Sequence, residues 1–98
     1  MKKIYISGKI TSCKDYQKRF EIAEKKLKEK GFEVVNPCLI PLEQKEPCYA
    51  DYMRADIREL ISCDFIFMLK NWRFSRGARF ERKTAKILNI PVFYERNV

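Results

Sequence analysis

The chain has 98 residues, of which 46% are hydrophobic, and it carries a formal net charge of +8. This length suits one small domain with a single core, and no apolar run approaches the roughly 20 residues of a membrane span. The charge favours anionic partners such as nucleotides, nucleic acid or acidic proteins, without choosing among them. Histidine is absent, which excludes catalytic triads with a histidine base and mixed cysteine–histidine zinc sites.

The cysteines are scattered, with no Cys-x-x-Cys pair among them (Cys13, Cys38, Cys48 and Cys63). The chain leads from its first residues directly into a strand-like run without a small-residue cleavage site, so we expect no signal peptide and a cytoplasmic protein. In that compartment the four side chains should be reduced thiols. A zinc site formed by all four thiolates is the less favoured alternative, because their spacing is irregular.

In chain order, the first predicted element is a strand at residues 4–7, a short β-type run closed by Gly8. Asp15 is a plausible N-cap for a helix that ends at Gly31. Apolar residues recur with helical spacing between these two positions, at Tyr16, Phe20, Ala23 and Leu27. The helix is therefore expected to bury one apolar stripe.

The rest of the chain continues to alternate strands with helices, and a proline-rich loop at 37–48 separates the second strand from the second helix. A loop of this length is usually functional or mobile. The predicted elements are a strand at 32–35, a helix at 49–62, a strand at 64–69, a helix from Arg76 to about Leu88 and a strand at 91–94.

This β-α-β-α-β-α-β order predicts a three-layer α/β domain of Rossmann-like or flavodoxin-like type. Its four strands should be parallel, joined by right-handed crossovers, with helices on both faces. The economical strand order is 2-1-3-4, which places a topological switch between the first and third strands. Ligands bind outside the carboxyl ends of the strands at such a switch, where residues 7–11 and 69–81 should meet.

The start of the third predicted helix has the composition of an anion site. Ser75, Arg76, Gly77 and Arg79 stand where free backbone N–H groups and the helix dipole favour a phosphate-sized anion. Glu81 follows one turn later. An acid beside a phosphate site suggests chemistry on a nucleotide.

Glu81 shares one helical face with Ala78, Ala85 and Leu88, so its side chain should point to the sheet. A charge there costs free energy unless it has partners or a function. We expect the helix N-terminus and nearby arginines to keep it ionised, as a carboxylate nucleophile requires. The alternative is a surface salt bridge to a basic neighbour on the same helix: Arg79, Arg82 or Lys83.

Asp56 lies at the edge of the apolar stripe of the second helix, four residues from both Tyr52 and Leu60. From there it can lean over the same crevice and hold a leaving base or transfer a proton. The alternative is an aspartate at the rim, paired with Arg54 or Lys70.

The end of the first strand supplies further candidates for ligand binding. Ser7 and Gly8 permit close approach of the backbone to a ligand, and Lys9 can contact a phosphate; the alternative is an ordinary turn with a solvated lysine. Tyr5 and Trp72 can stack on a base or pack against a sugar, although such residues more often fill a core. The chain has neither the G-x-G-x-x-G fingerprint nor a P-loop, so a Rossmann dehydrogenase or P-loop NTPase is not expected.

Three segments, taken in order, resemble the nucleoside 2-deoxyribosyltransferase-like superfamily, and a short branch of it in particular. They are Ile-Tyr-Ile-Ser-Gly at 4–8, Asp-Tyr-Met-Arg-Ala-Asp at 51–56 and Trp-Arg-Phe-Ser-Arg-Gly-Ala-Arg-Phe-Glu at 72–81. Each motif alone is modestly specific. Their order and spacing are much more specific, and the resemblance runs over nearly the whole chain, from the first predicted strand to the fourth.

The resemblance implies an enzyme in which a glutamate attacks C1′ of a deoxyribose and displaces the base, forming a covalent sugar ester. A second base or water then resolves the ester, which gives a transferase or an N-glycoside hydrolase. Glu81 matches the nucleophile, and Asp56 matches the aspartate that assists at the base. Ser75 and Gly77 match residues that bind the 5′-phosphate of nucleoside monophosphates, and residues 7–9 match the loop that lines the sugar-phosphate pocket.

The chain departs from its relatives at Lys9, where a small residue or proline is usual, and in its more basic third helix. Relatives borrow pocket residues from a neighbouring subunit near the C-terminus, where this chain offers only Asn97. We expect a homodimer or larger homo-oligomer that acts on a small nucleotide or nucleoside without metal or organic cofactor. The rivals are a non-catalytic nucleotide sensor or sponge, and a basic module for nucleic acid or protein that uses Arg73, Arg76, Arg79, Arg82 and Lys83.

Overall fold

The alternation of strands and helices that the sequence predicts is present in the structure, a computed structural model that describes residues 1–96. In chain order the elements are β1 (Lys3–Ser7), α1 (Tyr16–Glu29), β2 (Glu33–Val35), a 3₁₀ turn (Pro37–Leu39), α2 (Tyr49–Leu60), β3 (Phe65–Met68), a second 3₁₀ turn (Trp72–Phe74), α3 (Arg76–Ile87) and β4 (Val92–Tyr94).

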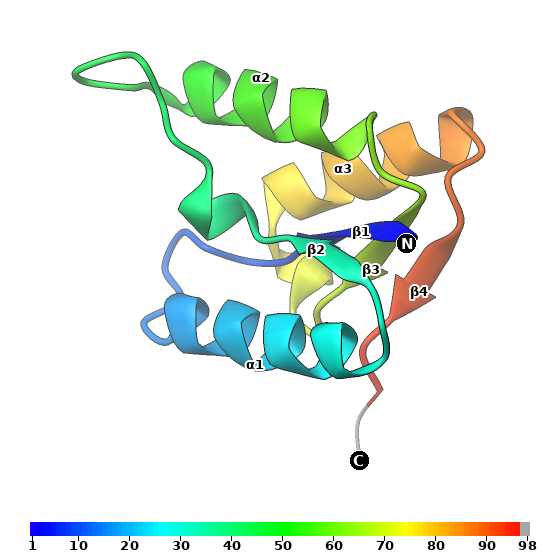
Figure 1. Cartoon of the computed structure of the whole chain (residues 1–98). Helices are drawn as coiled ribbons and strands as arrows, with labels where there is room; N and C mark the ends of the chain where they lie inside the picture. Colours follow the sequence, from blue (N-terminus) through cyan, green and yellow to red (C-terminus); the bar gives the residue numbers. More distant parts are fainter. Residues whose placement is uncertain (97–98) are drawn as a thin grey trace.

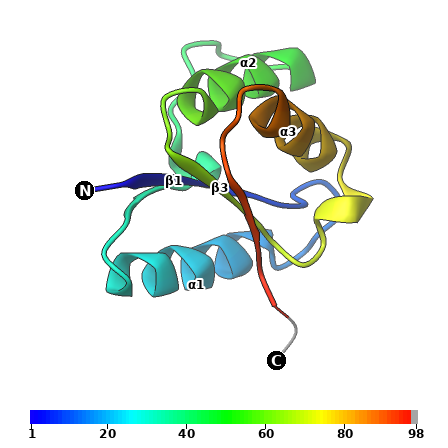
Figure 2. The same cartoon turned by 90° about the vertical axis from the view of Figure 1, so that its right-hand side faces the viewer.

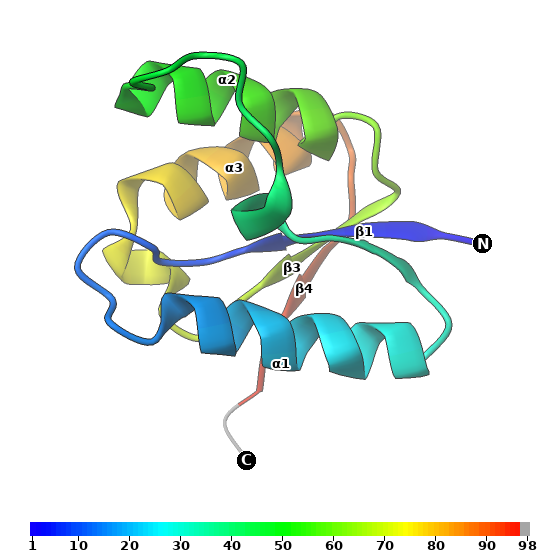
Figure 3. The ribbon, with the colours of Figure 1, turned by 60° about the vertical axis from the view of Figure 1, so that its left-hand side comes forward.

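The four strands form one parallel sheet in the order β2-β1-β3-β4. In its register Tyr5 lies beside Val35 on one side and Ile66 on the other. Helix α1 covers one face of the sheet, and α2 and α3 lie together on the opposite face (Figures 1 and 2). The predicted α/β architecture and strand order are therefore confirmed, and the three layers are visible edge-on in Figure 3.

Alternation along β1 divides its side chains between the two faces of the sheet. Ile4 and Ile6 pack on the side of α1, in one apolar cluster. Tyr5 belongs to the cluster on the other side, where Ser7 also points, because its hydroxyl meets a side chain of α3. One strand thus supplies two apolar residues to the first face and two hydroxyl groups to the second.

The core between α1 and the sheet is apolar. The predicted stripe of α1 buries Phe20, Ala23 and Leu27, while Tyr16 is partly buried at its end. Asp15 precedes the helix as expected, but its carboxylate pairs with Arg19 at 3.1 Å instead of capping a backbone N–H. This face therefore contributes mainly hydrophobic stabilisation.

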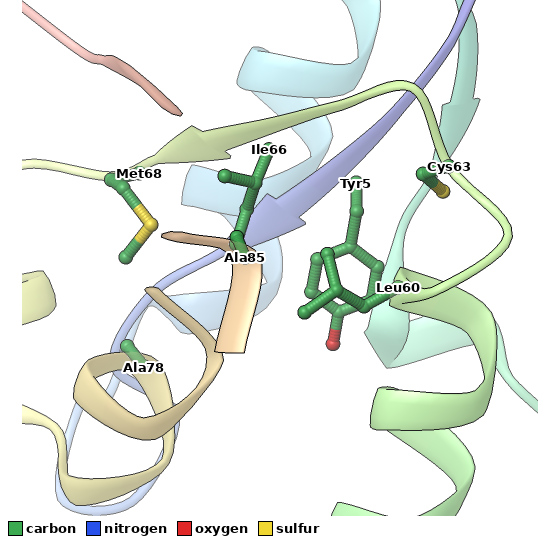
Figure 4. Close-up of a cluster of buried hydrophobic side chains, with 7 residues drawn as sticks. All are labelled: Tyr5, Leu60, Cys63, Ile66, Met68, Ala78 and Ala85. Carbon is green, nitrogen blue, oxygen red and sulfur yellow. The ribbon is translucent and has the colours of Figure 1, made fainter. Parts of the chain in front are cut away.

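The opposite face packs α2 and α3 against the sheet through a second cluster, shown in Figure 4. Its fully buried members are Tyr5, Leu60, Cys63, Ile66, Met68, Ala78 and Ala85. The predicted inward face of α3 is confirmed for Ala78, Glu81 and Ala85, whereas Leu88 follows the helix end and is 49% exposed. Alanine is the only apolar residue that α3 buries, so the helix backbone can lie close to the strands.

The ends of α2 and α3 explain where these helices begin. The backbone N–H of Cys48 donates to the Asp51 carboxylate at 2.9 Å, and Ser75 Oγ accepts from the Ala78 N–H at 3.1 Å. The long loop contains one short 3₁₀ turn, which the Asn36 side chain caps by accepting from the Cys38 N–H. Among residues 1–96, no helix is long and apolar enough to cross a membrane.

Candidate active site

A cavity of about 750 Å³ opens at the carboxyl ends of β1, β2 and β3. The residues that follow each of these strands form its walls: residues 8–12, then Pro37, Cys38 and Ile40, and residues 74–78. One side of α2 closes it from above the sheet, in the orientation of Figure 1. This is the edge of the sheet where the strand order reverses, and therefore the place where the topology predicts a ligand.

Glu81 projects from the second turn of α3 to the wall of this cavity and is only 5% exposed. Both of its carboxylate oxygens are held by β1: Tyr5 Oη donates to Oε2 at 2.9 Å, and Ser7 Oγ donates to Oε1 at 2.6 Å. No salt bridge within residues 1–96 involves Glu81. The alternative of a surface ion pair to a basic neighbour is therefore wrong.

Asp56 lines the same cavity from α2 and lies close enough to Glu81 for each carboxyl group to shift the pKa of the other. Two neighbouring carboxyl groups can share a hydrogen bond when one of them carries a proton. The predicted leaning of Asp56 over the crevice is thus realised. The salt bridges among the described residues do not include the expected alternative partners, Arg54 and Lys70.

Burial raises the pKa of Glu81 to about 8; the hydrogen bond from Ser7 acts in the opposite direction, and the Asp56 charge raises it further. Burial also raises the pKa of Asp56 to about 6, whereas the neighbouring Glu81 side chain lowers that pKa. Between these values the two carboxyl groups, taken as a pair, hold one proton. The expectation that arginines keep Glu81 ionised is wrong, because desolvation outweighs the hydrogen bonds and no arginine contributes to the shift.

The first turn of α3 forms the wall beside this pair. Ser75, Arg76 and Gly77 all line the cavity, as the predicted anion site requires. Within residues 1–96 the N–H groups of Arg76 and Gly77 donate no hydrogen bond to another group. The Arg76 guanidinium lies 4.9 Å from the centre of the Tyr49 ring, so its charge stands at the rim of the cavity.

The loop after β1 forms the facing wall. Gly8 and Lys9 line the cavity, and the Lys9 N–H donates to Asn71 Oδ1 at 3.1 Å, which ties this loop to the one after β3. A Cβ on Gly8 would lie 2.6 Å from Cδ1 of Leu69. The close approach of the Leu69 side chain therefore requires a glycine at this position, and the expected approach of a ligand to Gly8 stays a prediction.

Residues 2–94 match a protein family described as "Domain of unknown function (DUF4406)". The chain belongs to this family. The match extends from β1 to β4 and so includes the carboxyl pair and both walls of the cavity. No curated protein matches the chain.

Not every candidate residue of this DUF4406 domain lines the cavity. Tyr5 lies beneath the floor and contacts Glu81 instead of a ligand. Trp72 packs with Tyr94 on the side of β4, with ring centres 5.9 Å apart. Arg79 is exposed, outside the cavity wall. Asn97 lies outside the described residues.

The cavity also contains residues that the sequence reasoning missed. On α2, Tyr49, Tyr52 and Met53 line it together with Asp56, at positions i, i+3, i+4 and i+7. That spacing was visible in the sequence and could have placed all four on one face. Three more missed residues follow β2, in the loop whose path no local pattern predicts: Pro37, Cys38 and Ile40.

The acidic and sulfur side chains of the DUF4406 domain do not gather into a metal site. In the part of the chain that the structure describes, no group of three or more His, Cys, Asp or Glu residues could hold a metal ion. Its cysteines are unpaired: Cys13, Cys38, Cys48 and Cys63. The carboxyl pair is therefore the chemically distinctive feature of the cavity.

Proposed function

We propose that this protein cleaves the N-glycosidic bond of a nucleoside or deoxynucleoside 5′-monophosphate, with Glu81 as nucleophile. The observation that carries the proposal is the geometry of Glu81: a buried carboxyl at a cavity wall, with one hydroxyl on each oxygen and with Asp56 in the same cavity lining. A carboxylate held in one orientation by two donors is suited to attack a sugar carbon. The resemblance to nucleoside 2-deoxyribosyltransferase-like proteins supports the same residue roles.

The walls of the cavity fit the parts of a nucleotide. The first turn of α3 offers two N–H groups and the hydroxyl of Ser75 to a 5′-phosphate, with the positive end of the helix dipole behind them. Lys9 and Arg76 add positive charge at the rim. On α2, aromatic and sulfur side chains offer flat apolar surface to a base: Tyr49, Tyr52 and Met53.

The single proton of the carboxyl pair matches what the reaction needs. As the substrate binds, Glu81 passes its proton to Asp56 and becomes ionised. Its oxygen then forms a bond to C1′ while the C1′–N bond breaks. The bond electrons leave on the base nitrogen, which takes the proton from Asp56. Water attacks the resulting ester and gives its proton to Asp56, which regenerates the pair and completes a hydrolysis; attack by another base gives a transfer.

The test is release of free base from deoxynucleoside 5′-monophosphates, followed by chromatography. We expect Glu81→Gln to reduce the rate at least about a thousandfold, because the covalent route is lost. Asp56→Asn should reduce it by about 10²–10⁴-fold, the range for one general acid. Glu21→Gln, an exposed acid on α1, is the matched control and should retain the full rate. Unchanged release by Glu81→Gln would exclude the proposed nucleophile.

The rate should also show a bell-shaped dependence on pH. Only the singly protonated pair can supply both a nucleophile and an acid, and it prevails between the pKa values of about 6 and about 8. We expect kcat/KM to be highest near the middle of this range. A profile that rises continuously with pH would show that the proton of the pair is not used.

A second candidate function is binding of a nucleotide without turnover. The raised pKa of Glu81 favours it, because a carboxyl that stays protonated at neutral pH binds a sugar hydroxyl but does not attack carbon. This function predicts that nucleotides raise the Tm while no base is released. The expected homo-oligomer belongs to either function, and light scattering on the purified protein tests it.

A further inference from the structure

The outward side of α3 carries charge that the cavity does not use. Arg79, Lys83 and Lys86 are exposed, and Phe80 is 54% exposed beside them. None of these four residues lines the cavity. Glu81 is the only acid in the helix, and it points the opposite way, into the core. The charged side chains on the solvent side of α3 are therefore all cationic. We call Arg79, Phe80, Lys83 and Lys86 the cationic face.

The cationic face is unfavourable for the helix itself. Arg79 and Lys83 are four residues apart and Lys83 and Lys86 three apart, and like charges at these spacings repel. The first turn of α3 contains no acid to complement the helix dipole. No salt bridge within residues 1–96 involves α3, whereas α1 pairs Lys28 with Glu24 at 2.7 Å. The basic residues of α3 therefore do not stabilise the helix, and another role is needed to explain them.

An aromatic cluster adjoins the cationic face. The Arg82 guanidinium lies 4.6 Å from the centre of the Trp72 ring, and its Nε donates to Tyr94 Oη at 2.7 Å. Helical spacing places Arg79 and Lys86 one turn to either side of Arg82, so the charges continue up to these rings. Tyr94 is 43% exposed. The cations of α3 thus lie near two exposed rings, those of Phe80 and Tyr94.

We propose that the cationic face and this aromatic cluster bind single-stranded nucleic acid. Cations in a row complement a phosphate backbone, and α3, with its 12 residues, is about 18 Å long, enough for several phosphates. The exposed rings of Phe80 and Tyr94 favour a single strand over a duplex as the ligand, because only unpaired bases can stack on them. The surface lies outside the Glu81 cavity, so the inference does not rest on the proposed function.

The test is fluorescence anisotropy of a labelled oligothymidine of about 16 nucleotides, the upper site size for one small domain, titrated at several salt concentrations. With three cations in contact, log K should fall with log salt at a slope of about −2, since each phosphate contact contributes about 0.7 on a single strand. Lys83→Gln/Lys86→Gln should reduce that slope by about 1.4. Phe80→Ala should weaken binding roughly 5- to 150-fold, the effect of one lost stacking contact.

The matched control is Lys25→Gln/Lys26→Gln, which removes the same charge from the exposed side of α1 and should leave binding unchanged. All the substituted side chains are exposed, so the variants should keep the wild-type Tm or exceed it. Four results would overturn the inference: no binding at low salt, an equal loss in the α1 control, equally tight binding of duplex DNA, or equally effective competition by polyglutamate.

Discussion

Helices α1 and α3 cover opposite faces of one sheet, and each buries three side chains against it. The buried residues of α1 are Phe20, Ala23 and Leu27, all apolar. In α3, two alanines flank Glu81, so a carboxyl occupies the central position. The same amphipathic spacing therefore gives a hydrophobic contact on one face and a chemically reactive group on the other.

The difference shows how a small domain can contain a buried carboxyl. Small residues on both sides of Glu81 allow α3 to approach β1, so that the carboxyl reaches the hydroxyls of Tyr5 and Ser7. Burying an ionisable group is unfavourable unless hydrogen bonds compensate for lost hydration. The apolar contact of α1 with the sheet contributes hydrophobic stabilisation. This contribution offsets the smaller apolar contact that α3 makes.

The largest expected effect on stability comes from a substitution in the apolar core between α1 and the sheet. Phe20→Ala should lower the free energy of unfolding by about 3–5 kcal/mol, because it leaves a cavity between α1 and the sheet. Ile22→Ala, on the exposed side of the same helix, is the control and should cost less than about 1 kcal/mol. Urea denaturation measures both. Equal losses would mean that the two sides of α1 do not differ as the structure indicates.

The carboxyl face should make stability depend on pH. From its ordinary pKa of 4.5 up to about 8, Glu81 keeps its proton in the folded state and loses it in the unfolded state. The folded state then binds more protons, so the free energy of unfolding falls as pH rises through this range, by about 1 kcal/mol per pH unit. Denaturation at pH 5 to 8 should show this slope in wild type and a weaker one in Glu81→Gln.

Asp56 adds to the same slope at the acid end, since its pKa is raised from 3.8 to about 6. Glu21→Gln removes an exposed acid from α1 and should keep the wild-type dependence on pH. A stability that is constant from pH 5 to 8 in wild type would contradict the raised pKa of the pair.

The smallest effects come from two glycines, one near each face. Gly8→Ala would place a methyl group against Cβ and Cγ of Leu69 at 2.9 Å and should cost about 1–3 kcal/mol, because that side chain is fully buried. Gly77→Ala would meet only the ends of flexible side chains, Met53 Sδ and Tyr49 Oη, at 3.2 Å. Better helix propensity offsets that contact, so the change should stay within about 1 kcal/mol. A lower urea midpoint for Gly77→Ala than for Gly8→Ala would contradict this expectation.

The sequence by itself determined the elements, their parallel order and the buried faces of α1 and α3, because these follow from local periodicity and from the alternation of strands with helices. It also placed Glu81 and Asp56 at one crevice. The boundaries differ by at most two residues at helix and strand ends, where capping geometry decides.

Only the tertiary structure decided what these residues touch. Tyr5 and Ser7 are 76 and 74 positions from Glu81, and no local pattern specifies hydrogen bonds across that distance. The same holds for the contact of Trp72 with Tyr94 and for the space that Leu69 requires at Gly8. The protonation of Glu81 is decided in the same way, because a pKa depends on how completely the surrounding chain excludes water.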